Sequence, residues 1–60
     1  MDENILTKEE VAIKLRVHPR TVERWLRRGI LRGYKLGEGA TALWRISEKE
    51  LDRFLKKHSN

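Results

Sequence analysis

Arginine side chains gather in one stretch of the chain, residues 17–31, with the sequence VHPRTVERWLRRGIL. At the roughly 100° per residue of an α-helix, Arg20, Arg24 and Arg27 fall on one face. A guanidinium presents planar pairs of N–H donors and stays charged, so it suits phosphate oxygens and the O6/N7 edge of guanine. Glu23 lies beside these arginines and can accept a hydrogen bond from cytosine N4. The four side chains therefore have the chemistry to read base edges.

The same stretch predicts a short helix from about residue 19 to residue 28. Pro19 suits the first helical position, since the N–H that it lacks has no partner there in any residue. His18 then becomes the N-cap, and Gly29 is placed to end the helix in a left-handed conformation. Three apolar residues at i, i+3 and i+4 form the face that should be buried: Val22, Trp25 and Leu26.

An earlier helix is predicted over about residues 8–15. Thr7 and Glu10 form a capping box at its start, and Val11 with Leu15 should face inward. Three residues, 16–18, separate it from Pro19. Two helices joined by so short a turn indicate a helix-turn-helix. Arg16 stands where the turn often has glycine, and Ile13 lies off the buried stripe, either as an exposed apolar residue or as part of a contact surface.

A hairpin and a last helix complete the predicted fold. Two alternating runs around a glycine-bearing loop predict a β-hairpin over about residues 34–46. Its expected inward residues are Tyr34, Leu36, Trp44 and Ile46, whereas Lys35 and Arg45 are expected to face outward. A Ser47 capping box opens a helix over about residues 48–57. The fold class is therefore mostly α with a small β-hairpin wing, a winged helix-turn-helix in the order α-α-β-β-α, and residues 1–60 make a single domain.

Charge is distributed unevenly along the 60 residues, whose net charge is +5. Residues 14–45 hold nine Lys/Arg against two acids, a net charge of +7, and the flanks together carry −2. This asymmetry favours a polyanionic partner, most often nucleic acid and less often an anionic membrane surface or an acidic protein, although composition alone also fits a merely solvated basic surface. The chain has no cysteine and only two histidines, so neither a metal site nor a cofactor is expected. The absence of a long apolar run or a signal-peptide pattern favours a cytoplasmic location and no membrane contact.

Each candidate residue also has a structural interpretation. Glu23 can pair with Arg20 or Arg27 across one turn, but such pairs contribute only about 0.2–0.5 kcal/mol each, which does not account for three arginines on one face. Trp25 and Trp44 have the spacing of core residues rather than of base-stacking residues. Five residues are candidates for contacts to phosphate: His18, Thr21, Arg28, Lys35 and Arg45. The alternative for His18 and Thr21 is a role only in starting the helix, and for the other three it is ordinary surface charge.

From residue 6 to residue 55 the chain resembles the excisionase-type, MerR-like winged helix-turn-helix. The resemblance rests on the run LTKEEVAIKLRVHPRTVERWLRRGIL, a short wing, and the segment WRISEKELDRFL. It implies a bacterial, phage or mobile-element DNA-binding module with its second helix in the major groove. Arg20, Thr21 and Arg24 match the main DNA-contacting positions of the family, and Arg45 matches the arginine of the wing. The chain departs from the pattern at His18, where serine is usual, and in a longer, less basic wing loop.

Two functions are compatible with these features. The first is a double-stranded DNA-binding protein, acting as a transcriptional regulator, an excisionase or an architectural factor, with self-association or cooperative binding on DNA to gain affinity. The alternative is a winged-helix module that binds an acidic protein partner, suggested by Ile13 and the apolar wing. No small-molecule effector is expected, because the long dimerising helix of full MerR-type regulators is absent. An enzyme is not expected, because no nucleophile–base pair, phosphate-cradling loop or metal cluster stands in the sequence.

Overall fold

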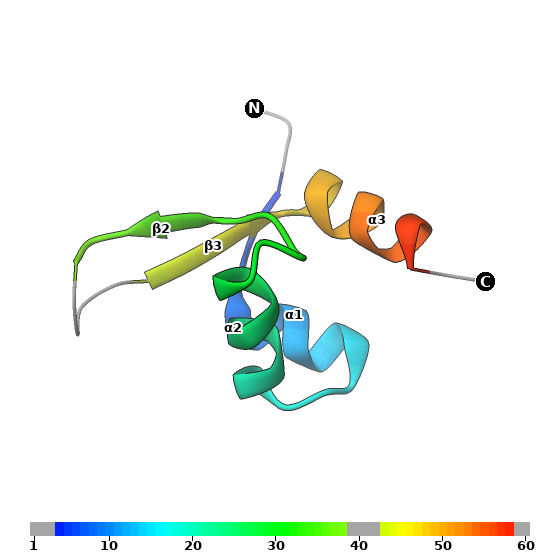
Figure 1. The fold of residues 1–60 in the computed structure, drawn as a ribbon, viewed down its shortest axis with the longest axis horizontal. Coiled ribbons are helices and arrows are strands. Elements are labelled where there is room, and N and C mark those ends of the chain that lie inside the picture. Colours follow the sequence, from blue (N-terminus) through cyan, green and yellow to red (C-terminus); the bar gives the residue numbers. More distant parts are fainter. Residues whose placement is uncertain (1–3, 39–42, 59–60) are drawn as a thin grey trace.

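Three short helices gather at one end of a small antiparallel sheet, and two strands of that sheet extend away from them as a wing (Figure 1). The structure, a computed structural model, describes residues 4–38 and 43–58. Its elements in chain order are β1 (Ile5–Thr7), α1 (Lys8–Leu15), α2 (Pro19–Arg27), β2 (Tyr34–Leu36), β3 (Leu43–Ser47) and α3 (Glu48–Lys57). The predicted helices and hairpin are confirmed, and the fold is a mostly α winged helix-turn-helix. Within the predicted wing loop, residues 39–42 lie outside the described residues.

The helix starts follow the predicted capping chemistry. The Thr7 hydroxyl accepts a hydrogen bond from the Glu10 amide at 3.0 Å, and the Glu10 carboxylate accepts one from the Thr7 amide at 2.8 Å, which completes the capping box of α1. At α3, the Ser47 hydroxyl accepts from the Glu50 amide at 3.1 Å, which is one half of the predicted capping box. The Glu50 carboxylate lies 3.6 Å from Arg53 Nη1. These hydrogen bonds satisfy amide groups that have no partner inside the first turn of a helix.

The turn between α1 and α2 is made without glycine. Arg16 adopts the left-handed conformation, with φ 58° and ψ 45°, at the position where glycine is common. The Val17 amide then donates to the Ala12 carbonyl at 3.0 Å, which closes the end of α1. The chain enters α2 at once through the N-cap His18, as the sequence predicts.

The end of α2 uses the predicted glycine. The helix ends at Arg27, with Arg28 as its C-cap, and Gly29 follows with φ +75°. The Ile30 amide donates to the Trp25 carbonyl at 3.0 Å, and the Gly29 amide donates to the Leu26 carbonyl at 3.2 Å. This pair of bonds is the Schellman arrangement, which turns the chain sharply toward β2.

The core lies where the three helices meet β3 and β1. Trp25 and Trp44 are partly buried against it, as predicted, and the Trp25 ring lies 5.0 Å from the ring of Phe54 in α3. Ile13 is 76% exposed, so it belongs to the surface of α1. The buried apolar residues are Leu6, Val11, Ala12, Val22, Leu26, Leu31, Ile46 and Leu51.

The sheet has the order β1-β3-β2, so the segment just before α1 is a strand of the sheet. The sequence predicts only a brief extended segment at residues 5–6. In the structure Leu6 pairs with Ile46 across β1 and β3, and both side chains enter the core. β1 thereby joins the first helix to the strand that leads into the last one.

The register of the wing corrects the predicted orientation of β2. Tyr34 pairs with Arg45, and Lys35 pairs with Trp44. Residues directly opposite in an antiparallel pair share a face of the sheet. Tyr34 therefore lies on the outer face with Arg45, and Lys35 lies on the inner face with Trp44. The prediction that Tyr34 faces inward is wrong, as is the prediction that Lys35 and Arg45 share the outer face.

A close approach at Gly33 gives the physical reason for this register. A Cβ atom built on Gly33 would lie 2.7 Å from Leu26 Cδ2 and 3.2 Å from Ile46 Cγ1. The inward position at residue 33 thus has room only for the hydrogen of glycine. Because side chains alternate along a strand, Tyr34 and Leu36 then point outward. Tyr34 and Leu36 are accordingly 59% and 53% exposed, which corrects the prediction that both are inward.

Candidate nucleic-acid interface

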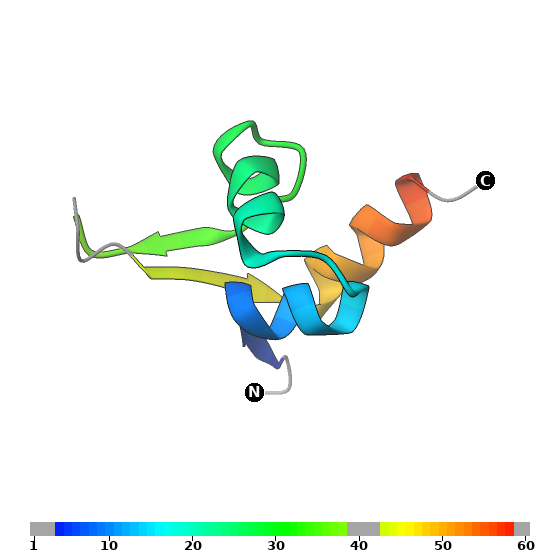
Figure 2. The ribbon, with the colours of Figure 1, turned by 90° about the horizontal axis from the view of Figure 1, so that it is seen from below.

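The outward face of α2 carries four exposed arginines. Val22 and Leu26 are buried on the opposite face, so the amphipathic pattern read from the sequence orients the helix as predicted. In Figure 2, α2 lies at the top of the view, with the wing extending to the left and α3 to the right. The exposed arginine side chains line a shallow hollow together with Glu23: Arg20, Arg24, Arg27 and Arg28.

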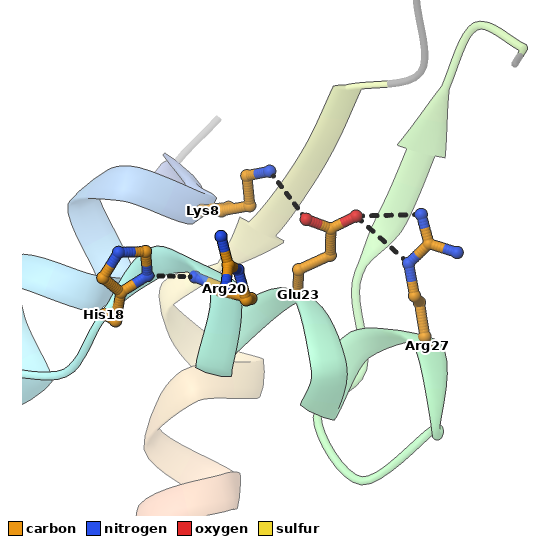
Figure 3. A network of polar contacts seen from close by, with 5 residues as sticks. All are labelled: Lys8, His18, Arg20, Glu23 and Arg27. Carbon is orange, nitrogen blue, oxygen red and sulfur yellow. Dashed lines mark hydrogen bonds and ion pairs between the residues drawn. The ribbon is translucent and has the colours of Figure 1, made fainter. Parts of the chain in front are cut away.

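Glu23 is the centre of a polar network on this face (Figure 3). Its Oε2 accepts hydrogen bonds from Arg27 Nε at 3.1 Å and from Arg27 Nη2 at 2.9 Å. Its Oε1 accepts from Lys8 Nζ at 3.2 Å, which brings in the first turn of α1. The hydrogen bonds from Arg27, and then the hydrogen bond and positive charge of Lys8, hold the pKa of the Glu23 carboxyl below its ordinary value. Glu23 is therefore ionised at neutral pH and engaged by both cations.

The other arginines of α2 are not engaged in this way. Among residues 4–38 and 43–58, the guanidinium groups of Arg20, Arg24 and Arg28 have no hydrogen-bond or ion-pair partner. Their spacing of four residues places them along one stripe of the helix surface. A stripe of guanidinium groups that no carboxylate of the described residues binds attracts an external anion.

The start of α2 adds polar groups to one end of this face. His18 Nδ1 accepts a hydrogen bond from the Arg20 amide at 3.0 Å. When Nδ1 of a neutral imidazole accepts, the proton lies on Nε2, which can donate outward. Thr21 is half-buried one position beyond Arg20, and its amide is bonded to the His18 carbonyl at 2.9 Å. The two predicted phosphate contacts thus lie at the N-terminal end of the arginine stripe.

The wing separates its two predicted phosphate contacts. Lys35 Nζ lies 5.9 Å from the centre of the Trp44 ring, within reach of a cation–π contact on the inner face. Arg45 is half-buried on the outer face, and its Nη1 donates to the Trp44 carbonyl at 2.9 Å. The sequence pattern predicts that Lys35 and Arg45 share one surface, but the structure places them on opposite faces of the wing.

Lys8 is the site residue that sequence reasoning did not find. It lies 15 positions before Glu23 in the chain, in a different helix, and it looks like any lysine after an N-cap. Only the crossing of α1 and α2 brings the two side chains together. No local pattern in the sequence signals this contact.

Two kinds of feature are absent from the part of the chain that the structure describes. Residues 4–38 and 43–58 contain no group of three or more His, Asp or Glu side chains that could hold a metal ion. Over the same ranges, no helix has the length and apolar character needed to cross a membrane.

Comparison with known families gives one match, to the helix-turn-helix domain family over residues 5–59. The chain belongs to this family. The match covers every helix and strand described above, and it confirms the excisionase-type, MerR-like resemblance that the sequence predicts. A search of curated proteins returned no match. As a helix-turn-helix domain with an unpaired arginine stripe on its second helix, this protein has the features of a DNA-binding module.

Proposed function

We propose that this helix-turn-helix domain binds double-stranded DNA with α2 in the major groove. The observation that carries the proposal is the stripe of arginines on α2 without partners among the described residues. An α-helix fits the major groove, where the guanidinium fork can make two bonds to one guanine. We assign base reading to Arg20, Arg24 and Arg27.

Contacts to the DNA backbone are assigned to residues at the edges of the same face. His18 and Thr21 lie at the start of α2, and Arg28 caps its end. Lys35 and Arg45 lie on opposite faces of the wing, so on a rigid wing they reach different phosphates. Backbone contacts of this kind orient a protein on the duplex and supply most of the salt-dependent affinity.

The small size of the domain limits how tightly one copy can bind DNA. A single small module covers only about 600–1,000 Å² of DNA-facing surface, too little for tight and selective binding by itself. We therefore propose a transcriptional regulator, or an excisionase or architectural factor, that binds in tandem, as a self-associated pair or beside a partner protein. Such a protein acts by occupying DNA rather than by catalysis. It would be located with the DNA, which in bacteria lies in the cytoplasm.

The test is fluorescence anisotropy of labelled random duplex DNA across a salt series, for the wild type and for Arg24→Ala. Neutralising four to six phosphates gives a log–log slope of roughly −4 to −5. On a duplex then selected from the random pool with the wild type, Arg24→Ala should weaken binding by about 1–3 kcal/mol and relax the preference at one base pair. Lys56→Ala is the control, because it removes one positive charge from α3, where Lys56 pairs with Asp52 at 3.3 Å. Absence of binding at low salt would refute the proposal.

A protein-binding function is the second candidate. Ile13 is 76% exposed on α1, and Leu43 is exposed near the far end of the wing. If this is the function, Ile13→Ser and Leu43→Ser would abolish binding to an acidic protein partner. The arginine variants Arg20→Ala, Arg24→Ala and Arg27→Ala would then have no effect on DNA binding.

A further inference from the structure

We infer that Glu23 is a positioning residue for Arg27, and that it controls base selectivity without touching a base. This inference rests on the proposed DNA binding and deepens it. Glu23 has the type and position of a cytosine reader, the role that the sequence suggests for it. The structure instead gives both of its carboxylate oxygens to cations of the same chain (Figure 3).

Glu23 holds one edge of the Arg27 guanidinium group. Glu23 binds Nε and Nη2, which form one edge of the planar guanidinium, at 3.1 and 2.9 Å. Because the group is rigid and planar, holding one edge sets the direction of the whole plane. The two hydrogens on Nη1 and one on Nη2 stay free, so the Nη1–Nη2 edge is still able to make paired bonds to guanine O6 and N7. Glu23 thus orients the reading edge and leaves it open.

Glu23 is itself held in place by Lys8. Lys8 Nζ binds the other oxygen at 3.2 Å, from the first turn of α1. The Lys8 and Glu23 side chains are 26% and 29% exposed, whereas the Arg27 side chain is 67% exposed. Lys8 and Glu23 are therefore partly buried, and Arg27 reaches solvent. A side chain held this way before DNA arrives loses less conformational freedom on binding.

The negative charge of Glu23 separates a positioning role from a purely electrostatic one, because the two roles change DNA binding in different ways. A carboxylate on a DNA-facing surface repels phosphate, so neutralising Glu23 strengthens binding to every duplex if its only influence is electrostatic. A positioning role predicts a different result, in which discrimination at the base pair read by Arg27 falls while affinity for random DNA stays equal or rises. One well-made bidentate contact discriminates by about 5- to 150-fold, so the expected loss at that base pair is about fivefold or more.

The experiment first selects a preferred duplex with the wild-type protein. Anisotropy titrations then measure Kd on that duplex and on its single-base-pair variants for the wild type, Glu23→Gln, Arg27→Ala and the double variant. Asp52→Asn is the matched control, because it neutralises the acid of another i,i+4 pair, with Lys56 at 3.3 Å on α3. Lys8→Gln is a second probe of the same network, and far-UV circular dichroism verifies that each variant is folded.

The expected result is that Glu23→Gln loses discrimination at the same base pair as Arg27→Ala, with no further loss in the double variant. Lys8→Gln should give a smaller loss at that base pair, and Asp52→Asn should give none. Tighter binding to all duplexes with unchanged selectivity would overturn the inference. So would a loss at a different base pair that adds to that of Arg27→Ala, because Glu23 would then read a base directly. If the wild type binds no duplex at all, the proposed function itself fails.

Discussion

Replacing Arg16 by glycine should make this protein more stable, although it removes a residue from the helix-turn-helix turn. Arg16 is the one non-glycine residue with positive φ in the described part of the chain, at φ 58° and ψ 45°. A left-handed conformation costs a residue with a Cβ about 1–2 kcal/mol. Glycine avoids that cost but loses about 0.5–1 kcal/mol of extra chain entropy on folding. We therefore expect Arg16→Gly to raise the free energy of unfolding by about 1 kcal/mol or slightly less.

The native contacts at Arg16 support this value. The hydrogen bonds of the turn are made by its backbone, with the Arg16 amide 3.2 Å from the Ile13 carbonyl, and glycine keeps them. The Arg16 side chain is exposed and has no partner among the described residues, so its removal forfeits no contact. In a domain of this size, 1 kcal/mol corresponds to a rise in Tm of about 4–8 °C.

The assay is thermal unfolding followed by far-UV circular dichroism, at one protein concentration and without DNA. Arg32→Gly is the control, because Arg32 is also an exposed arginine in a connection but does not have positive φ. It should leave Tm unchanged or lower it. The strain argument is refuted if Arg16→Gly fails to raise Tm, or if both variants shift it in the same direction by the same amount.

Two further predictions concern the packing and the charge of the same fold. Gly33→Ala should destabilise the domain by about 1–3 kcal/mol in urea unfolding, because its Cβ would lie 2.7 Å from Leu26 Cδ2 and 3.1 Å from the Arg45 carbonyl oxygen. An unchanged urea midpoint would show that β2 can move away from these atoms at no cost. For Glu23, the pKa of the folded state lies below the ordinary value of 4.5, so its ion pairs stabilise the fold above that pH and their contribution is lost as pH falls through the folded-state pKa. The difference in unfolding free energy between the wild type and Glu23→Gln should therefore be constant near neutral pH and shrink in acid, and a difference that grows in acid would contradict the network.

The local structure of this protein is largely readable from its sequence, because local interactions decide it. Thr7 and Glu10 satisfy each other's amides across three residues, and His18 with Pro19 begins α2 in the same way. Gly29 ends α2 because it tolerates positive φ. The spacing of Val22 and Leu26 sets which face of α2 is buried, and the arginines follow on the opposite face. None of these features depends on a residue more than a few positions away.

The tertiary structure alone decided the features that join distant segments. The pairing of β1 with β3 needs a partner some 40 positions away, so the sequence predicts only a brief extended segment at residues 5–6 and not its place in a sheet. The wing register turned on Gly33, whose fit against Leu26 shows only in the packed structure. A shift of one residue in a strand moves every side chain to the other face, so alternation alone could not place Tyr34.

The same limit applies to the candidate site. The sequence determined that arginines face outward on α2, because helical periodicity alone places them there. The sequence leaves open whether Arg20 or Arg27 pairs with Glu23. In the structure Arg27 does, while Lys8 reaches the other Glu23 oxygen from another helix at 3.2 Å. Such a contact is set by the crossing of α1 over α2, and that crossing is set by core packing rather than by any neighbouring residue. The sequence therefore determined the chemistry of this face, and the tertiary structure decided how that chemistry is arranged.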